Sequence, residues 1–183
     1  MQPPVDRHWR VLEEADVVCS AEEAARAVRR LADEIARRLS ATFPLVLGVM
    51  GGGVVFTGQL LPLLHFPLEF DYIHVTRYRG GMQGGTIEWK VEPRRPLAGR
   101  VVLVLDDILD EGHTLAAIRE RLLQQGASAF YSAVFCDKDI GKAKPIHADY
   151  VGVSVPNRYV FGFGMDVEGA WRNLPAVYAV KDS

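Results

Sequence analysis

The chain has 183 residues, of which 49% are hydrophobic and 24% are charged, and its formal net charge is −2. This length and composition are typical of a single globular domain and exclude a disordered or collagen-like protein. The absence of a basic excess argues against a protein that holds nucleic acid on a charged surface.

Helices and strands alternate in the first part of the chain. Ser20 and Glu23 form a capping box, which predicts a helix over residues 21–39 with apolar residues at helical spacing. A short apolar run at 45–50 predicts a strand and ends in three consecutive glycines. The apolar sequence from residue 54 onward then predicts a helix. This order is that of a strand, a glycine turn and a helix.

The middle of the chain predicts a hairpin followed by a buried strand. Residues 69–76 are rich in strand-forming side chains, and residues 86–91 alternate loosely, as a returning hairpin strand does. The segment between these strands is dense in glycine, and we predict a flexible loop over residues 77–88. Residues 101–105 form the most apolar run of the chain. Because this run shows no alternation, it indicates a strand buried on both faces of a parallel sheet.

The remaining elements complete an α/β pattern. Residues 115–126 predict a helix that Gly126 ends, and residues 130–136 and 150–155 predict two further strands. Strands that alternate with helices form βαβ units. We therefore expect an α/β fold with a doubly wound, mostly parallel sheet in a single domain over residues 1–183. Ligands of such sheets gather beyond the carboxyl ends of the strands.

Cysteine and histidine spacing and the lack of long apolar runs exclude further classes. Cys19 and Cys136 form no CxxC pair, as is usual in a reduced cytoplasmic protein. The five histidines show no HExxH spacing, so a zinc site is not expected. No apolar run reaches the roughly 18 residues of a membrane span, and the acidic start lacks the core of a signal peptide. We expect a cytoplasmic protein without a membrane partner.

Residues 101–115 contain the side chains that point most clearly to a binding or catalytic site. The buried strand leads into Asp106 and Asp107, and a loop with Asp110 and Gly112 then enters a helix near Thr114. The start of a helix exposes unpaired amide hydrogens and suits a phosphate. Acidic residues beside an anion site suit a divalent metal ion, sugar hydroxyls or a proton to be removed. A solvated acidic loop with a capping threonine is the alternative interpretation.

This segment resembles the signature of the type I phosphoribosyltransferases, which is an apolar strand, two acids, two apolar residues, Asp, a small residue, Gly, any residue and Thr. The matching residues are Asp106, Asp107, Ile108, Leu109, Asp110, Gly112 and Thr114. Glu111 departs from the usual small or hydroxyl residue, and His113 stands at the variable position. Residues toward the C-terminus resemble the hypoxanthine-guanine branch of the family, and these are Lys138, Arg158, Tyr159, Val160, Gly162, Phe163, Asp166 and Arg172.

The resemblance implies an enzyme that transfers ribose 5-phosphate from phosphoribosyl pyrophosphate to a ring nitrogen of a 6-oxopurine and releases pyrophosphate. It implies Mg²⁺ as cofactor, with Asp106, Asp107 and Asp166 as metal-binding residues. Asp106 and Asp107 also bind the ribose hydroxyls, and Asp110 is implied as the general base toward the purine N7 proton. The 5′-phosphate loop comprises Asp110, Glu111, Gly112, His113 and Thr114.

The resemblance also assigns the purine and pyrophosphate sites. Lys138 binds the purine O6, Tyr159 stacks on the base, Val160 contributes its backbone carbonyl, and Asp166 meets the exocyclic edge of the base or a second Mg²⁺. Pyrophosphate is bound by Gly51, Gly52 and Arg172. Met50 departs from the family because a lysine or arginine is common there. The residues expected to form a lid over the site are Arg77 and Tyr78.

Two statements about the whole molecule come from the resemblance alone, which spans roughly residues 15–180. Residues 150–183 and the N-terminal segment form a hood over the base, and the protein is a homo-oligomer, a dimer or a tetramer. The alternative functions are a xanthine-guanine or adenine transferase and a non-enzymatic relative that senses nucleotides and binds RNA. The net charge of −2 weighs against RNA binding.

Overall fold

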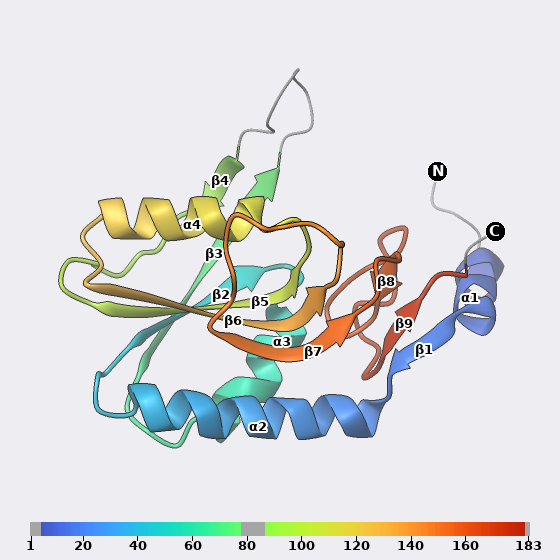
Figure 1. The fold of residues 1–183 in the computed structure, drawn as a ribbon, viewed down its shortest axis with the longest axis horizontal. Coiled ribbons are helices and arrows are strands. Elements are labelled where there is room, and N and C mark those ends of the chain that lie inside the picture. The colour runs from blue at the N-terminus through green and yellow to red at the C-terminus, as the bar shows by residue number, and fades with distance from the viewer. Residues whose placement is uncertain (1–4, 78–86, 182–183) are drawn as a thin grey trace.

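In the computed structural model, which describes residues 5–77 and 87–181, the chain forms a six-stranded and a three-stranded β-sheet (Figure 1). The larger sheet has the order β4-β3-β2-β5-β6-β7, in which β4 is antiparallel and the other strands are parallel. Its strands are β2 (Leu45–Met50), β3 (Glu69–Arg77), β4 (Ile87–Val91), β5 (Val101–Leu109), β6 (Ala129–Lys138) and β7 (Tyr150–Val155). The α/β class and the mostly parallel sheet are confirmed.

Helices cover both faces of this sheet (Figure 1). On one face lie α2 (Ala21–Leu39) and α3 (Val54–Leu60), and on the other lies α4 (His113–Gln124). The predicted capping box opens α2, since Glu23 N donates to Ser20 Oγ and Ser20 N donates to a Glu23 carboxylate oxygen. The helix predicted from residue 54 ends earlier than its sequence suggested, and a short 3₁₀ turn, η1 (Leu61–Leu63), follows it.

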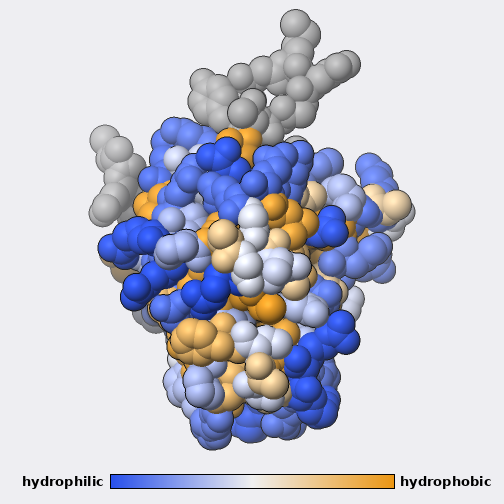
Figure 2. All heavy atoms as spheres, turned by 90° about the vertical axis from the view of Figure 1, so that its left-hand side faces the viewer, coloured by the Kyte–Doolittle hydropathy of each residue, from blue (hydrophilic) through white to orange (hydrophobic). Residues whose placement is uncertain are grey.

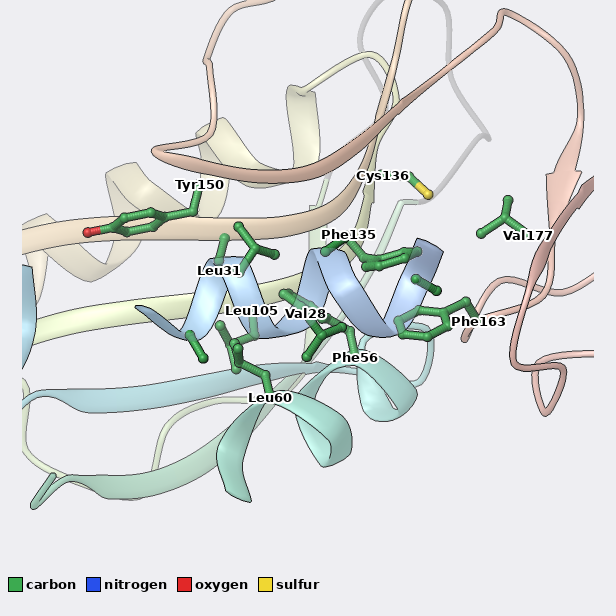
Figure 3. Close-up of a cluster of buried hydrophobic side chains, with 14 of the residues drawn as sticks. Val28, Leu31, Phe56, Leu60, Leu105, Phe135, Cys136, Tyr150, Phe163 and Val177 are labelled. Atoms are coloured by element: carbon green, nitrogen blue, oxygen red, sulfur yellow. The ribbon is translucent and has the colours of Figure 1, made fainter. Parts of the chain in front are cut away.

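The core is divided between the two faces of the sheet. Val46, Leu103 and Leu105 pack on the side of α2 and α3, whereas Leu47 and Val104 pack on the side of α4. Figure 3 shows the first of these clusters, with side chains from both helices meeting those of the central strands. Burial of both faces explains why the strand sequences show no alternation of apolar and polar residues.

A smaller antiparallel sheet joins the two ends of the described chain. It contains β1 (Asp16–Cys19), β9 (Val177–Ala179) and β8 (Val160–Phe161), in that order. Helix α1 (Val5–Glu14) precedes β1 and lies beside this sheet (Figure 1). The Phe163 ring stacks on that of Phe135 in the large sheet, with centroids 3.8 Å apart. The sequence had assigned these segments to a hood without predicting the elements that form it.

The face of the molecule shown in Figure 2 is mostly polar. Figure 2, which views the left-hand side of Figure 1, shows hydrophilic side chains over most of that face and hydrophobic ones gathered near its middle. Within residues 5–77 and 87–181, no helix has the length and apolar character that spanning a membrane requires. Both cysteines are free thiols in the interior.

Candidate active site

A large cleft opens at the carboxyl ends of the parallel strands. It encloses about 1060 Å³ and is lined by the ends of β2, β3, β5 and β6, the loop into α4 and parts of the C-terminal segment. The expected site residues along it are Gly51, Gly52, Asp106, Asp107, Asp110, Glu111, Gly112, His113, Thr114, Lys138 and Arg172. Strand ends that meet at one edge of a parallel sheet account for this convergence.

Asp106 and Asp107 lie within β5 rather than beyond it. The predicted strand stopped at residue 105, but pairing with β6 continues as far as Leu109 opposite Asp137. Each acid accepts a hydrogen bond from the backbone N–H of the next residue, at 2.9 Å for Asp106 and 2.8 Å for Asp107. The continued ladder thus fixes both carboxyl groups at the floor of the cleft.

The acid pair is electrostatically unfavourable in the protein alone. Burial raises the pKa of Asp106 well above its usual range, and the negative charge of Asp107 raises it further. Burial also raises the pKa of Asp107, while hydrogen bonds from Asp106 and Ile108 and the charge of Arg172 oppose that shift. A cation or hydroxyl donors placed against the pair would relieve the repulsion.

The loop between β5 and α4 presents a helix N-terminus to the cleft. Gly112 caps α4 with a left-handed backbone, φ 83°, and no side chain occupies the cap. A β-carbon on Gly112 would lie 3.3–3.4 Å from side-chain atoms of Lys144, Pro145 and Ile146, so this segment packs closely behind the loop. The amide groups of the first turn are unpaired within the helix and suit a phosphate.

Asp110 and Lys138 form an ion pair beside this loop. Lys138 Nζ lies 3.0 Å from Asp110 Oδ2, and the lysine side chain is 12% exposed whereas that of Asp110 is 50% exposed. Lys138 is the last residue of β6, which extends beyond the predicted end at residue 136. Because Leu109 and Asp137 pair in the sheet, the residues that follow them are neighbours. The structure therefore joins the expected base and the expected purine-binding lysine.

The glycine turn after β2 fits closely over the acid pair. A β-carbon on Gly52 would lie 1.9 Å from Asp107 Oδ2, so only glycine allows this approach. A β-carbon on Gly164 would lie 2.0 Å from the backbone oxygen of Gly52, which shows that the C-terminal segment covers the turn. The Met50–Gly51 peptide bond is cis, and Met50 lines the cleft where a basic residue is common in the family it resembles.

Of the expected residues in the C-terminal segment, Arg172 lines the cleft, and the others do not. Arg172 Nη2 lies 2.5 Å from Asp166 Oδ1, and its Nη1 donates to the Gly164 oxygen at 2.7 Å. The Tyr159 hydroxyl donates to the backbone oxygen of Asp166, and Val160 is buried in β8. Tyr159, Val160 and Asp166 are not among the residues that line the cleft.

Comparison with known proteins agrees with this geometry. The family model of the phosphoribosyl transferase domain matches residues 16–168 of the sequence, which is most of the chain. The chain belongs to the phosphoribosyltransferase family. Its parallel sheet, the acids Asp106 and Asp107 and the loop between β5 and α4 all lie inside the matched range.

Relatives of this phosphoribosyltransferase come from the hypoxanthine-guanine branch. A hypoxanthine-guanine phosphoribosyltransferase of Streptococcus pneumoniae is 30% identical over 91% of the chain and 93% of the relative. A hypoxanthine-guanine-xanthine phosphoribosyltransferase of Tritrichomonas foetus is 34% identical over 91% and 92%. A solved hypoxanthine-guanine-xanthine phosphoribosyltransferase superimposes with a TM-score of 0.84 at 31% identity, covering 93% and 99% of the two chains. These comparisons confirm the resemblance of the sequence to the hypoxanthine-guanine branch of the type I phosphoribosyltransferases.

The two carboxyl groups of the acid pair are suitable ligands for a divalent metal ion. Among the described residues, no three His, Cys, Asp or Glu side chains gather to hold a metal ion. Asp166 is paired with Arg172 and with the backbone N–H of Gly169. Mg²⁺ is usually held by one or two carboxylates together with phosphate oxygens and water. Asp106 and Asp107 match that requirement.

Several cleft residues were not found from the sequence. They are His74, Thr76, Ile140, Lys142 and Asn157, which line the cleft from β3 and from the segments after β6 and β7. Their position at or after strand ends was the available signal, but no motif marks them. Arg77 ends β3 opposite Ile87, which confirms the predicted hairpin. Tyr78, the other expected lid residue, lies outside the described residues.

Proposed function

We propose that this phosphoribosyltransferase is a Mg²⁺-dependent purine salvage enzyme that transfers the 5-phosphoribosyl group of phosphoribosyl pyrophosphate to hypoxanthine or guanine. The products are IMP or GMP and pyrophosphate. The observation that carries the proposal is the cleft in which the acid pair, the helix N-terminus after Gly112 and the Asp110–Lys138 pair face one volume. Sugar hydroxyls, a phosphate and a 6-oxopurine each have a complementary group there.

The phosphoribosyl group is held by residues of β5 and the loop after it. Asp106 and Asp107 accept hydrogen bonds from the two ribose hydroxyls, which places donors against the repelling carboxylates. The amide groups from Gly112 to Thr114 bind the 5′-phosphate at the positive end of α4. Mg²⁺, when bound, neutralises charge on the pyrophosphate as it leaves. The amides of Gly51 and Gly52 and the Arg172 guanidinium hold that leaving group.

The purine is bound by the Asp110–Lys138 pair. Lys138 donates to the O6 oxygen, a contact that the amino group of adenine does not accept. As the bond from C1 of the ribose to pyrophosphate breaks, a ring nitrogen of the base bonds to C1, and the proton on N7 of the purine passes to Asp110. Tyr159 stacks on the base, and Val160 and Asp166 meet its other edge. For these three residues, support comes from the family pattern, and the hydrogen bond from the Tyr159 hydroxyl to the Asp166 backbone oxygen brings two of them together.

Xanthine is the second candidate acceptor. The Tritrichomonas relative and the solved neighbour are both named for hypoxanthine, guanine and xanthine. A lysine that binds O6 accepts all three bases, because each carries an oxygen at that position. An RNA-binding relative without catalysis is less well supported, since the net charge is −2 and the general base Asp110 is present in the cleft.

Location and assembly complete the proposal. A cytoplasmic enzyme is supported by the two free thiols, because a reducing compartment keeps cysteines unpaired. The family resemblance supports a homo-oligomer, a dimer or a tetramer. Size-exclusion chromatography with light scattering on the full chain measures this directly, and a monomer at micromolar concentration would contradict it.

The test of function supplies phosphoribosyl pyrophosphate and Mg²⁺ with hypoxanthine, guanine, xanthine or adenine in turn and follows nucleotide formation. We expect hypoxanthine and guanine to be used and adenine to be rejected, because Lys138 can donate to O6 but not to an amino group. Equal use of adenine would contradict the proposal that Lys138 selects 6-oxopurines by donating to O6. No nucleotide from any base would refute the proposed reaction.

A further inference from the structure

The side chain of Lys144 is largely buried, and no motif of the sequence marks this residue. Its side chain is 8% exposed, and it lies six residues after Lys138 in the segment between β6 and β7. Lysine is almost never buried unless its ammonium group is paired. The contacts of this ammonium group therefore define what the residue does.

All three N–H donors of the Lys144 ammonium group have a partner at the ends of β5 and β6. Nζ donates to the backbone oxygen of Leu109 at 2.8 Å, to the backbone oxygen of Lys138 at 2.6 Å and to Asp137 Oδ1 at 2.5 Å. An ammonium group has three donors and no acceptor, so its hydrogen-bonding capacity is filled. One side chain thus connects the last residues of two neighbouring strands.

The two strand ends that Lys144 connects carry the expected catalytic pair, Asp110 and Lys138. Leu109 directly precedes Asp110, and the second bonded carbonyl belongs to Lys138 itself. The pair is joined by one ion contact of 3.0 Å, and its acid is half exposed. An ion pair that is so exposed to water contributes little to fixing the relative position of its two side chains. The relative position of the two side chains must therefore be fixed from the backbone below them.

We propose that Lys144 is a positioning residue, which holds Asp110 and Lys138 at the separation that purine binding and proton removal require. This inference rests on the proposed function, since it assigns a task to the pair that Lys144 supports. Its side-chain stem and the two residues after it also pack behind Gly112. The ammonium group acts on the pair, whereas the stem supports the phosphate loop, so the two roles can be separated by substitution.

The first test is Lys144→Met, which removes the ammonium group and keeps the stem behind Gly112. We expect kcat with hypoxanthine to fall by about tenfold to a hundredfold, as for a misplacement near 1 Å, and the KM for hypoxanthine to rise. The KM for phosphoribosyl pyrophosphate should change by less than about twofold, because the acid pair and Arg172 are untouched. Lys144→Arg, which retains donors, should recover most of kcat. Unchanged kcat in Lys144→Met would overturn the inference.

A double substitution separates positioning from general support of the fold. Asp110→Asn alone should lower kcat by about a hundredfold if Asp110 is the base. In that background Lys144→Met should lower kcat by less than about threefold further, because residues that act as a unit are not additive. Two effects that multiply would overturn the inference. Lys90→Met, an exposed lysine of β4 outside the cleft, is the matched control and should leave both constants unchanged.

A structural measurement makes the inference independent of activity. In a crystal structure of Lys144→Met, the distance from Lys138 Nζ to Asp110 Oδ2 should exceed about 3.5 Å, beyond hydrogen-bonding range. A retained contact near 3 Å would overturn the inference even if the enzyme proved to have another substrate. If loss of the ammonium group leaves Asp137 unpaired and prevents folding, Lys144→Met with Asp137→Asn removes that charge and serves for the same measurements.

Discussion

At the scale of single residues, the glycine at position 52 is required by the carboxylate beside it. Gly52 lies in the turn after β2, and Asp107 lies on the neighbouring strand β5, which pairs with β2 in parallel. The turn backbone can approach the acid only where there is no side chain. A glycine there brings its amide group close to the charged floor of the cleft, where a pyrophosphate and its cation would meet.

Gly52→Ala should disable the cleft while leaving the fold intact. The added methyl group would lie 1.9 Å from Asp107 Oδ2, so the carboxylate must turn away from its position. Loss of one charge-assisted contact is expected to raise the KM for phosphoribosyl pyrophosphate by roughly tenfold to a hundredfold. Steady-state kinetics with varied phosphoribosyl pyrophosphate and saturating hypoxanthine measures this change.

Gly58→Ala is the matched control for that substitution. Gly58 lies inside α3, and apart from its chain neighbours and the backbone of its own helix no atom lies within 4 Å of the added β-carbon. Alanine is preferred over glycine in a helix by about 0.5–1 kcal/mol, so the melting temperature should rise slightly. The KM should not change. A wild-type KM in Gly52→Ala would contradict the assignment of the turn to the substrate site.

At the scale of elements, several strands of the large sheet were predictable because they are short apolar runs. The predicted ranges 45–50 and 150–155 coincide with β2 and β7. The ends of β5 and β6 were not predictable, because the charged residues Asp106, Asp107, Asp137 and Lys138 interrupt the apolar runs. Pairing with the neighbouring strands keeps these ends in the sheet. The small sheet was missed because β1 and β9 are short and come from opposite ends of the chain.

The site was predicted to the extent that its residues lie in one local motif. Asp106, Asp107 and the loop to Thr114 could be interpreted from residues 101–115 alone. Lys138 and Arg172 required the family resemblance, because a single lysine or arginine has no local signature. Lys144 was not found at all. Its partners include backbone oxygens on two strands, and no sequence pattern encodes such contacts.

Helix α1 gives an element-level prediction about the C-terminal segment. The rings of Trp9 and Trp171 meet edge to face at 4.9 Å, and Trp171 Nε1 donates to the His8 oxygen at 3.0 Å. Trp171 directly precedes Arg172, which lines the cleft. Trp9→Ala should cost about 0.5–1.5 kcal/mol of stability and raise the KM for phosphoribosyl pyrophosphate more than it lowers kcat.

Calorimetry and steady-state kinetics measure the two effects of Trp9→Ala. Arg10→Ala, an exposed neighbour on the same helix, is the control and should change neither quantity. A drop in melting temperature with no change in KM would mean that α1 stabilises the fold without supporting Arg172.

At the scale of the whole molecule, the acid pair trades stability for function. Asp106 and Asp107 are adjacent carboxyl groups whose pKa values are raised by burial. A carboxyl with a raised pKa in the folded state makes its full contribution to stability below its unfolded pKa of about 3.8. That contribution is lost as the pH rises through the raised value. Ionising both acids in the free protein is therefore unfavourable, and ribose hydroxyls and a cation placed against them would relieve that penalty.

Asp106→Asn should make the free protein more stable at pH 7.5 and abolish nucleotide synthesis. The amide keeps an oxygen that accepts from the Asp107 N–H, and it removes the charge. Each kcal/mol gained raises the melting temperature by about 2–4 °C in a domain of this size. The gain should shrink as the pH falls through the raised pKa of Asp106 toward its unfolded value, because the carboxyl is then protonated in the folded protein. Asp33→Asn, at an exposed position of α2, should show no such pH-dependent gain. A melting temperature that falls at pH 7.5 would show that the Asp106 charge is already compensated in the free protein.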